Sequence, residues 1–589
     1  MSELIDHHAH GAGHFAAIPS ASLPWRKRSF LIDIPIFVLG VALLYSVVAM
    51  ARYWYGPLTP QVEIDLRARA LPLYALYSVL RIALAYFLSL AFTLVYGYIA
   101  AYNQRAERFM VPLLDVLQSI PVLSFLPGVM LAMVALFPRR QLGVEMGSIL
   151  LIFTGQVWNM AFSFYSSLKN IPTEMREAAK LYRFSWWQKF TQMELPFSVI
   201  GLVWNSMMSV AGGWFFLMAC EMFVLGKRDF RLPGLGSYLQ TAASEGNTRA
   251  ILYGVMTMIV IVVLTDQLVW RPIVAWAQKF KFETVEASEL VRSPVLTLIR
   301  RSRLLTTITR KTVAPFFESL QLRFAKREIT ELVSGQQASL PRRIWPVVIA
   351  VLAFCACLYM AFKGVVLLSG VSAPELKLIT QGLFATFGRV TVALVVGCLW
   401  TIPAGVAIGT HPRLAKIAQP LAQIAASVPA TALFPVVVLA LVKMGGGLGI
   451  ASILLLLLGT QWYLLFNIIA GASAIPTELE EACHIYRFSA WERWRKLVLP
   501  AIFPYLITAL ITASGGAWNA SIVAEYFHLQ GRIFSTVGLG AVISQASDDG
   551  NFRLLFAATI FMAGTVVLVN RLVWRRLYRL ASARFKLEM

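Results

Sequence analysis

Twelve apolar runs, each long enough to cross a lipid bilayer, set the strongest limit on the fold of this chain. A spanning helix needs about 20 apolar residues, and in lipid only helices or closed barrels satisfy every backbone polar group. Charged residues make up 14% of the 589 residues, against roughly 25% in soluble domains. We therefore expect an all-α polytopic membrane protein. The expected spans are 30–50, 71–101, 111–137, 144–166, 197–223, 251–270, 344–368, 378–408, 417–442, 448–470, 501–527 and 554–573.

The chain carries a net charge of +22, which nucleic-acid binding would explain in a soluble protein. In a membrane protein the simpler explanation is that cytoplasmic loops are rich in Lys and Arg. Residues 271–343 hold fourteen Lys and Arg against six Glu, and Arg26 and Arg575 lie near the two ends. We expect cytoplasmic termini, a lipid bilayer around the spans and no nucleic-acid partner. The pairs Arg139-Arg140 and Lys227-Arg228 would then face outside.

Two short charged segments, 171–196 and 475–500, are copies of one element between apolar runs. Each ends in Leu-Pro, and the two prolines lie 304 positions apart (500 − 196). Close repetition at such a long period indicates a duplication rather than two ordinary surface loops. We expect each copy to form helix, turn and helix on the cytoplasmic face, with a capping box at Thr477 and Glu480.

The duplication divides the chain into two membrane domains of six spans each, at 30–275 and 344–575. A basic cytoplasmic linker at 276–343 joins them, and cytoplasmic tails are expected at 1–29 and 576–589. The first tail contains His7, His8, His10 and His14. Clustered imidazoles can bind transition metals, but no cysteine accompanies them, so no metal site is predicted. The five cysteines of the chain show neither a disulfide framework nor zinc spacing.

Each half places one arginine and one glutamate inside apolar runs. Arg81 and Arg389 are 308 positions apart (389 − 81), and each stands about 15 Å into its run at 1.5 Å per residue. An arginine in lipid needs a partner or a watery cavity, so a structural ion pair and a role in solute passage both fit. Glu221 and Glu525, near the outer ends of later runs, are the candidates to pair with these arginines.

Repeated serines and prolines interrupt the third run of each half. At the offset of 308 they are Ser119 and Pro121, then Ser427 and Pro429. Proline interrupts a membrane helix, and the freed backbone groups are tolerated only beside protein or water; a packing kink would also explain them. We expect these runs to line a pathway. Trp214 and Trp518, which follow glycine-containing pairs, are assigned to the same pathway or gate.

The repeated segments resemble the signature loop of binding-protein-dependent ABC importer permeases. The Ser-x-x-Arg, Gln-Ser-Ile-Pro-Val and Ala-Glu elements resemble the nitrate, sulfonate and taurine branch of that family. The resemblance covers nearly all of both halves and implies two tandem type I importer domains, fused in one chain in a bacterial inner membrane. It implies a set of residues that couple to ATPase subunits: Glu177, Ala178, Ala179, Tyr182, Arg183, Phe184, Glu481, Ala482, Cys483, Tyr486, Arg487 and Phe488.

One departure from the family pattern falls in this loop. Where the motif usually has glycine, this chain has Arg183 and Arg487, and arginine costs more than glycine in a left-handed turn. The usual turn geometry is therefore in question. Because both copies keep Tyr-Arg-Phe-Ser, we expect them to dock on identical grooves, hence on two copies of one ATPase. The resemblance also admits a periplasmic or extracellular solute-binding protein as a partner.

The expected function is the permease subunit of an ATP-driven importer for a small anionic solute, such as nitrate, a sulfonate or bicarbonate. The chain has no P-loop, so we expect ATP and Mg on the partner subunits, no cofactor on this chain and no enzymatic activity of its own. Closure of the ATPases would make a cavity near Arg81, Arg389, Ser119 and Ser427 change the side it faces. An ion-coupled secondary transporter is the alternative, because it also uses repeats and buried ionisable residues. A membrane enzyme is a weaker alternative, since no catalytic group recurs.

Overall fold

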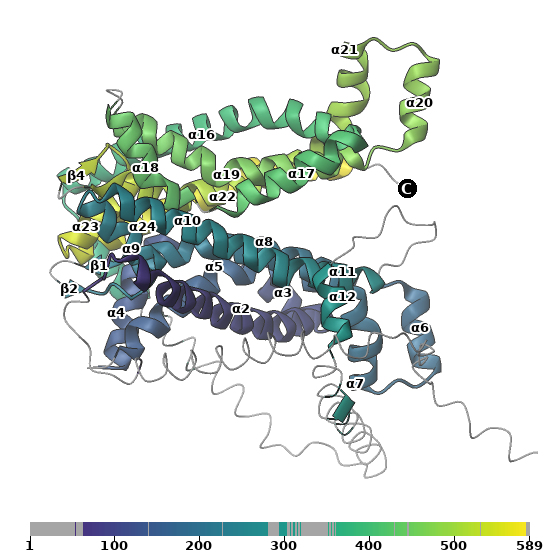
Figure 1. Cartoon of the computed structure of the whole chain (residues 1–589), viewed down its shortest axis with the longest axis horizontal. Helices are drawn as coiled ribbons and strands as arrows, with labels where there is room; N and C mark the ends of the chain where they lie inside the picture. Colours follow the sequence, from purple (N-terminus) through teal and green to yellow (C-terminus); the bar gives the residue numbers. More distant parts are fainter. Residues whose placement is uncertain are drawn as a thin grey trace, which may run out of the picture.

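The computed structural model describes residues 63–138, 141–225, 228–280, 294–302, 361–428, 430–443, 447–529 and 532–584, with isolated positions elsewhere. It consists of two helical halves that lie alongside each other, the first purple to teal and the second green to yellow (Figure 1). Among the described residues, eight helical stretches are long and apolar enough to span a membrane: Ala68–Tyr102, Leu142–Lys169, Trp186–Glu221, Thr248–Phe280, Ala373–Thr410, Leu448–Ser473, Ala490–Ala524 and Phe552–Ala581. The expected span at 30–50, and most of the one at 344–368, lie outside the described residues.

Three long helices form the centre of the first half, where α5 packs against both α2 and α8. Small residues allow close contact: a Cβ atom on Gly97 of α2 would lie only 2.7 Å from Phe164 of α5. The helices of this half are α2 (Leu71–Tyr102), α3 (Gln104–Ser119), α4 (Leu126–Leu136), α5 (Leu142–Lys169), α6 (Thr173–Leu181), α7 (Trp186–Lys189), α8 (Leu195–Glu221), α9 (Leu235–Ser244), α10 (Thr248–Thr265), α11 (Arg271–Ala277) and α12 (Pro294–Arg301). Short 3-10 turns are η1 (Ala68–Ala70), η2 (Val122–Phe125) and η5 (Gln278–Phe280).

The second half repeats this arrangement, with α19 packed between α16 and α22. Its helices are α16 (Ala373–Thr410), α17 (Pro412–Ser427), α18 (Ala430–Lys443), α19 (Leu448–Ser473), α20 (Thr477–Ile485), α21 (Ala490–Arg493), α22 (Leu499–Ala524), α23 (Leu539–Asp548), α24 (Phe552–Val569) and α25 (Arg575–Arg584). Even local irregularities recur at the offset of 304. The π-helical segments η3 (Phe190–Glu194) and η4 (Asp266–Trp270) return as η7 (Trp494–Val498) and η8 (Asn570–Trp574).

Two expected spans are not single helices. The run 111–137 is divided between α3 and α4, and the run 417–442 between α17 and α18. In the first half the cause is Pro121, which lacks a backbone N–H and holds the preceding Ile120 in an extended conformation (φ −79°, ψ 126°). The expected interruption is confirmed at Pro121, whereas Pro429 lies outside the described residues.

Two small β-hairpins add to the all-α architecture, and the sequence did not predict them. Strand β1 (Val224–Leu225) pairs antiparallel with β2 (Arg228–Asp229), and β3 (Tyr526–Leu529) with β4 (Arg532–Ser535). They lie beside α9 and α23 at one end of the molecule, here called the β-hairpin end (Figure 1). The helical hairpins α6–α7 and α20–α21 project from the opposite end, here called the coupling end. Both duplicated segments therefore lie on the same face.

Candidate functional site

The first duplicated segment forms a tight helix ending at the coupling end. The Phe184 backbone N–H donates to the Ala179 carbonyl at 2.9 Å, and the Arg183 N–H donates to the Lys180 carbonyl at 3.0 Å. These two bonds are those of a Schellman ending, which needs a left-handed residue after the helix. Arg183 supplies it, with φ 50°.

The second segment repeats this ending bond for bond. Phe488 N–H donates to the Cys483 carbonyl at 2.9 Å, Arg487 N–H donates to the His484 carbonyl at 3.1 Å, and Arg487 has φ 51°. The arginines have therefore not changed the turn. Each instead adopts a conformation that costs a side-chain-bearing residue about 1 kcal/mol.

Apolar side chains at the tip of each hairpin face outward without cover among the described residues. Leu181 and Tyr182 are 81% and 73% exposed, and their counterparts Ile485 and Tyr486 are 77% and 75% exposed. Contiguous exposed apolar residues mark interaction surfaces. The other predicted coupling residues divide into exposed Glu177, Ala178, Arg183, Glu481 and Arg487, half-buried Phe184, Ala482 and Phe488, and buried Ala179 and Cys483.

The capping box expected at Thr477 and Glu480 is wrong. The N-cap residue of α20 is Pro476 and the helix begins at Thr477, so Thr477 does not occupy the position that a capping box requires. Glu480 instead accepts a 2.8 Å hydrogen bond from Arg493 of α21, which ties the two arms of the hairpin. The capping boxes lie at the second arm of each hairpin, where Ser185 pairs with Gln188 and Ser489 with Glu492.

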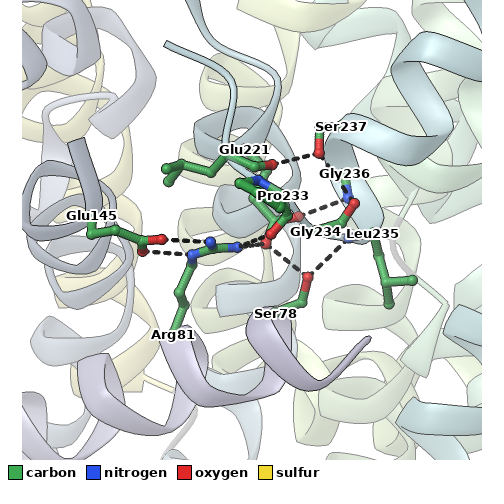
Figure 2. Close-up of polar contacts among 10 residues, drawn as sticks. Ser78, Arg81, Glu145, Glu221, Pro233, Gly234, Leu235, Gly236 and Ser237 are labelled. Carbon is green, nitrogen blue, oxygen red and sulfur yellow. Dashed lines mark hydrogen bonds and ion pairs between the residues drawn. The ribbon is translucent and has the colours of Figure 1, made fainter. Parts of the chain in front are cut away.

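Near the β-hairpin end, Arg81 lies in a fully buried cluster of charges (Figure 2). Its Nε and Nη2 donate to the two carboxylate oxygens of Glu145 at 2.7 and 2.6 Å, and its Nη1 donates to Glu221 at 2.7 Å. All three side chains are 0% exposed. Together with Ser78 they form the Arg81 cluster, which joins α2, α5 and α8. The expected pairing of Arg81 with Glu221 is confirmed.

The Arg81 cluster also holds the first turn of α9. Leu235 N–H donates to Ser78 Oγ at 3.0 Å, and Gly236 N–H donates to Glu221 at 2.7 Å, so two free amides of the helix start are satisfied. A Cβ atom on Gly234 would overlap the Glu221 carboxylate, which explains the glycine there (Figure 2). The carboxylate therefore stabilises both a buried arginine and a helix N-terminus.

The second half contains the corresponding Arg389 cluster of Thr386, Arg389, Glu525 and Thr536. Arg389 Nη1 donates to Glu525 at 2.8 Å, which confirms the second expected pairing, and Nη2 donates to the Thr536 hydroxyl at 2.8 Å. Gly540 N–H donates to Glu525 at 2.9 Å, repeating the contact with the start of α9 at the start of α23. Arg389 is 14% exposed. The two arginines are thus held in ion pairs near the β-hairpin end.

Sequence reasoning missed Glu145 and the role of the repeated glycines. A lone carboxylate in the apolar run 144–166 was the available signal for Glu145, because an unpaired charge there would be expensive. The signal for Gly234 and Gly538 was their repetition at the offset of 304, and in the structure a Cβ atom on either glycine would overlap the carboxylate of Glu221 or Glu525.

The break at Pro121 lies against the other half of the molecule. Leu123 N–H donates to Asn519 of α22 at 3.4 Å, and the Ser124 carbonyl accepts from Thr559 of α24 at 3.0 Å. Backbone groups freed by the break are therefore satisfied by the second half, as a helix interruption in a membrane requires. The side chains of Ser119 and Ser427 lie outside the described part of the structure. Trp214 and Trp518 are 3% and 1% exposed, so both side chains are buried.

Within the described residues no group of three His, Cys, Asp or Glu is placed to hold a metal ion. The histidines of the first tail lie outside those residues.

The model of one protein family, binding-protein-dependent transport system inner membrane component, matches residues 93–269 and 401–586. The nitrate import permease of Leptolyngbya laminosa is 27% identical over 33% of this chain and 67% of its own length. The bicarbonate transport system permease of Synechocystis is 27% identical over 32% of this chain and 66% of its own length. The taurine transport system permease of Escherichia coli is 26% identical over 32% of this chain and 62% of its own length.

Each relative thus matches about one third of this chain, whereas the family match occurs twice and covers most of both halves. The domain boundaries and the orientation of the termini remain predictions. The chain belongs to the family of binding-protein-dependent transport system inner membrane components, as a non-catalytic, multi-pass permease of an ABC importer with two permease domains fused in tandem.

Proposed function

We propose that this chain forms both halves of the pathway of one importer, docks two copies of one ATPase subunit through α6 and α20, and carries a small anionic solute. The observation that carries the docking proposal is the close similarity of the two tips. Both have the same left-handed turn, both expose an aliphatic residue followed by a tyrosine, and both project from the coupling end (Figure 1). Two similar surfaces at one end of the molecule fit two copies of one ATPase subunit.

A chain of contacts links the first docking hairpin to the boundary between the halves. Lys169, the last residue of α5 before the hairpin, donates to Glu107 of α3 at 2.7 Å. This hydrogen bond lowers the pKa of Glu107, so its carboxylate is charged at neutral pH. Helix α3 leads directly to the break at Pro121, which contacts the second half. A push on α6 would reach the pathway by this route.

The solute is proposed to meet neutral hydrogen-bonding groups rather than arginines, because Arg81 and Arg389 are already paired. Gln156 of α5 is 0% exposed, and neither its amide nitrogen nor its amide oxygen has a partner among the described residues. Tyr463 of α19 approaches the first half closely: a Cβ atom on Gly212 would lie 3.7 Å from its hydroxyl. Names of relatives include nitrate, bicarbonate and taurine, which are small oxygen-rich solutes with a negative group.

Co-purification tests the docking proposal. Glu177→Arg and Glu481→Arg reverse an exposed charge on α6 and α20, and among the described residues neither glutamate makes a side-chain hydrogen bond or ion pair that would be lost. We expect each to reduce ATPase co-purified from mild detergent by about half, and the double variant to abolish it. The matched control is Arg105→Glu, a charge reversal at the coupling end but on α3. Full ATPase recovery with the double variant would refute the docking role.

Transport into proteoliposomes tests the solute proposal. The chain, its ATPases and its binding protein would be assayed with labelled nitrate, bicarbonate and taurine, with and without ATP. We expect ATP-dependent uptake of one of them, reduced at least tenfold by Gln156→Leu, while ATPase co-purification stays unchanged. Uptake that persists without ATP would favour the ion-coupled alternative.

A further inference from the structure

A cavity of about 600 Å³ opens between α16 and α22 in the second half and extends to η8. Its floor is apolar and buried, with Leu394 at 7% and Trp518 at 1% exposure. Its rim is exposed, with Val395 at 52%, Leu399 at 71% and Val573 at 44% exposure. An apolar cavity of this size lies within the range of small-molecule sites.

The first half has a large side chain at the corresponding place. Tyr86 corresponds to Leu394 at the offset of 308, and Trp270 to Trp574 at the offset of 304. The ring of Tyr86 packs edge-on against Trp270, with 5.9 Å between ring centres. In the second half leucine replaces the tyrosine, and Trp574 lines the cavity. The second half therefore lacks an aromatic ring at a position that lines its cavity, whereas the first half has one there.

The position of the cavity indicates what fills it. It lies on spanning helices of an inner membrane protein, and its exposed rim faces the surroundings of those helices. Its wall along α16 extends from Phe387 to Pro403, which at 1.5 Å per residue is about 24 Å. One leaflet of the hydrocarbon core is about 15 Å thick, so the wall is long enough for an acyl chain. An unfilled apolar void would lose the dispersion contacts of its lining.

Positive charge stands where the headgroup of such a lipid would lie. Arg575 and Arg576 directly follow Trp574 at the start of α25, and α25 packs against α22 toward the coupling end. Basic residues at the membrane surface attract anionic lipids. We propose that this cavity binds one acyl chain of an anionic phospholipid, whose headgroup lies at Arg575 and Arg576. This inference goes beyond the transport function and does not depend on it.

Native mass spectrometry of the full chain, incubated with phosphatidylglycerol or phosphatidylcholine in mild detergent, tests the proposal. We expect one phosphatidylglycerol retained per chain, at least fivefold in preference to phosphatidylcholine. Leu394→Tyr, which restores the first-half residue, abolishes retention. Val392→Tyr adds the same ring on α16 at an exposed position outside the cavity and leaves retention unchanged. Arg576→Gln reduces the preference about fivefold.

Two further measurements keep the proposal falsifiable if Leu394→Tyr does not fold. Tyr86→Leu opens the corresponding place beside Trp270, and we expect it to raise the retained phosphatidylglycerol from one to two per chain. A photo-crosslinker at Val395 should label phosphatidylglycerol in vesicles of that lipid. Crosslinking to residues 344–360 of the same chain would show that the protein itself covers the cavity and would overturn the proposal. Equal retention by the unaltered chain, Leu394→Tyr and Tyr86→Leu would also overturn it.

Discussion

The Arg81 cluster and the Arg389 cluster occupy the same place in the two halves, but their charges differ. Arg81 lies between the carboxylates of Glu145 and Glu221, and nothing of the three side chains is exposed. Among the described residues Arg389 pairs with one carboxylate, that of Glu525, and it remains 14% exposed. The first cluster thus holds two acids against one base, whereas the second is balanced.

A single position explains much of this difference. Gly449 lies 304 positions after Glu145 (449 − 145), so the second half lacks the second carboxylate, and Thr536 bonds to Arg389 instead. As a result the Arg81 cluster ties α5 to α2 and α8, while among the described residues the Arg389 cluster contains no member from α19. Duplicated halves can therefore keep one fold and still differ in how firmly their central helices are joined.

Removing Arg81 should have the largest effect. In Arg81→Met two carboxylates are left buried without their partner, and breaking such a buried pair costs about 3–5 kcal/mol. We expect a free energy of unfolding lower by that amount in denaturant titrations, or loss of the folded chain. Arg105→Met on the exposed start of α3 is the control and should change nothing. Stability equal to that of the unaltered chain would mean that the cluster does not hold the first half together.

Removing Arg389 should cost less. In Arg389→Met only Glu525 is left, and it keeps hydrogen bonds from Thr386 and from the Gly540 amide. We expect a loss of about 2–3 kcal/mol in the same titration, because one buried acceptor loses a charged donor. If the loss equalled that of Arg81→Met, the second carboxylate would contribute nothing and the comparison between the clusters would fail.

The sequence was sufficient to predict the helical fold, the duplication and the two ion pairs, because these depend on apolar length, repetition and the cost of a charge in lipid. The sequence was not sufficient to predict the remaining contacts, because one segment of sequence does not show which other segments lie beside it in space. Glu145 could be paired only after α5 was placed beside α2. Strands β1 and β2 contain two residues each, which is too short for an alternating pattern to reveal them in the sequence. The sequence indicates that arginine at position 183 is unfavourable in a left-handed turn. Only the structure shows that the turn keeps its geometry and that Arg183 adopts the strained left-handed conformation.

The coupling turns provide the opposite case, in which the halves have not diverged. Arg183→Gly and Arg487→Gly relieve the same left-handed strain, so each should stabilise the chain by about 0.5–1 kcal/mol, and by equal amounts. Thermal unfolding in detergent measures this effect. Strained residues persist where they serve a function, so ATPase co-purification should fall although stability rises. Unequal shifts would show that the two turns differ in ways that their matching dihedral angles do not reveal.

Supplying the missing carboxylate should have the smallest effect and sharpens the comparison most. A Cβ atom on Gly449 would lie 3.9 Å from the Thr536 hydroxyl, so Gly449→Glu has room beside the oxygen that Arg389 contacts. A further buried carboxylate gains attraction to the arginine but loses its hydration, and the two terms nearly cancel. We therefore expect a free energy of unfolding within about 1 kcal/mol of that of the unaltered chain.

The informative measurement is the free energy of unfolding of the double variant Gly449→Glu with Arg389→Met. It should fall about as much as in Arg81→Met, because the double variant too buries two unpaired carboxylates. A loss no greater than that of Arg389→Met alone would show that the first half depends on more than the number of carboxylates around its arginine.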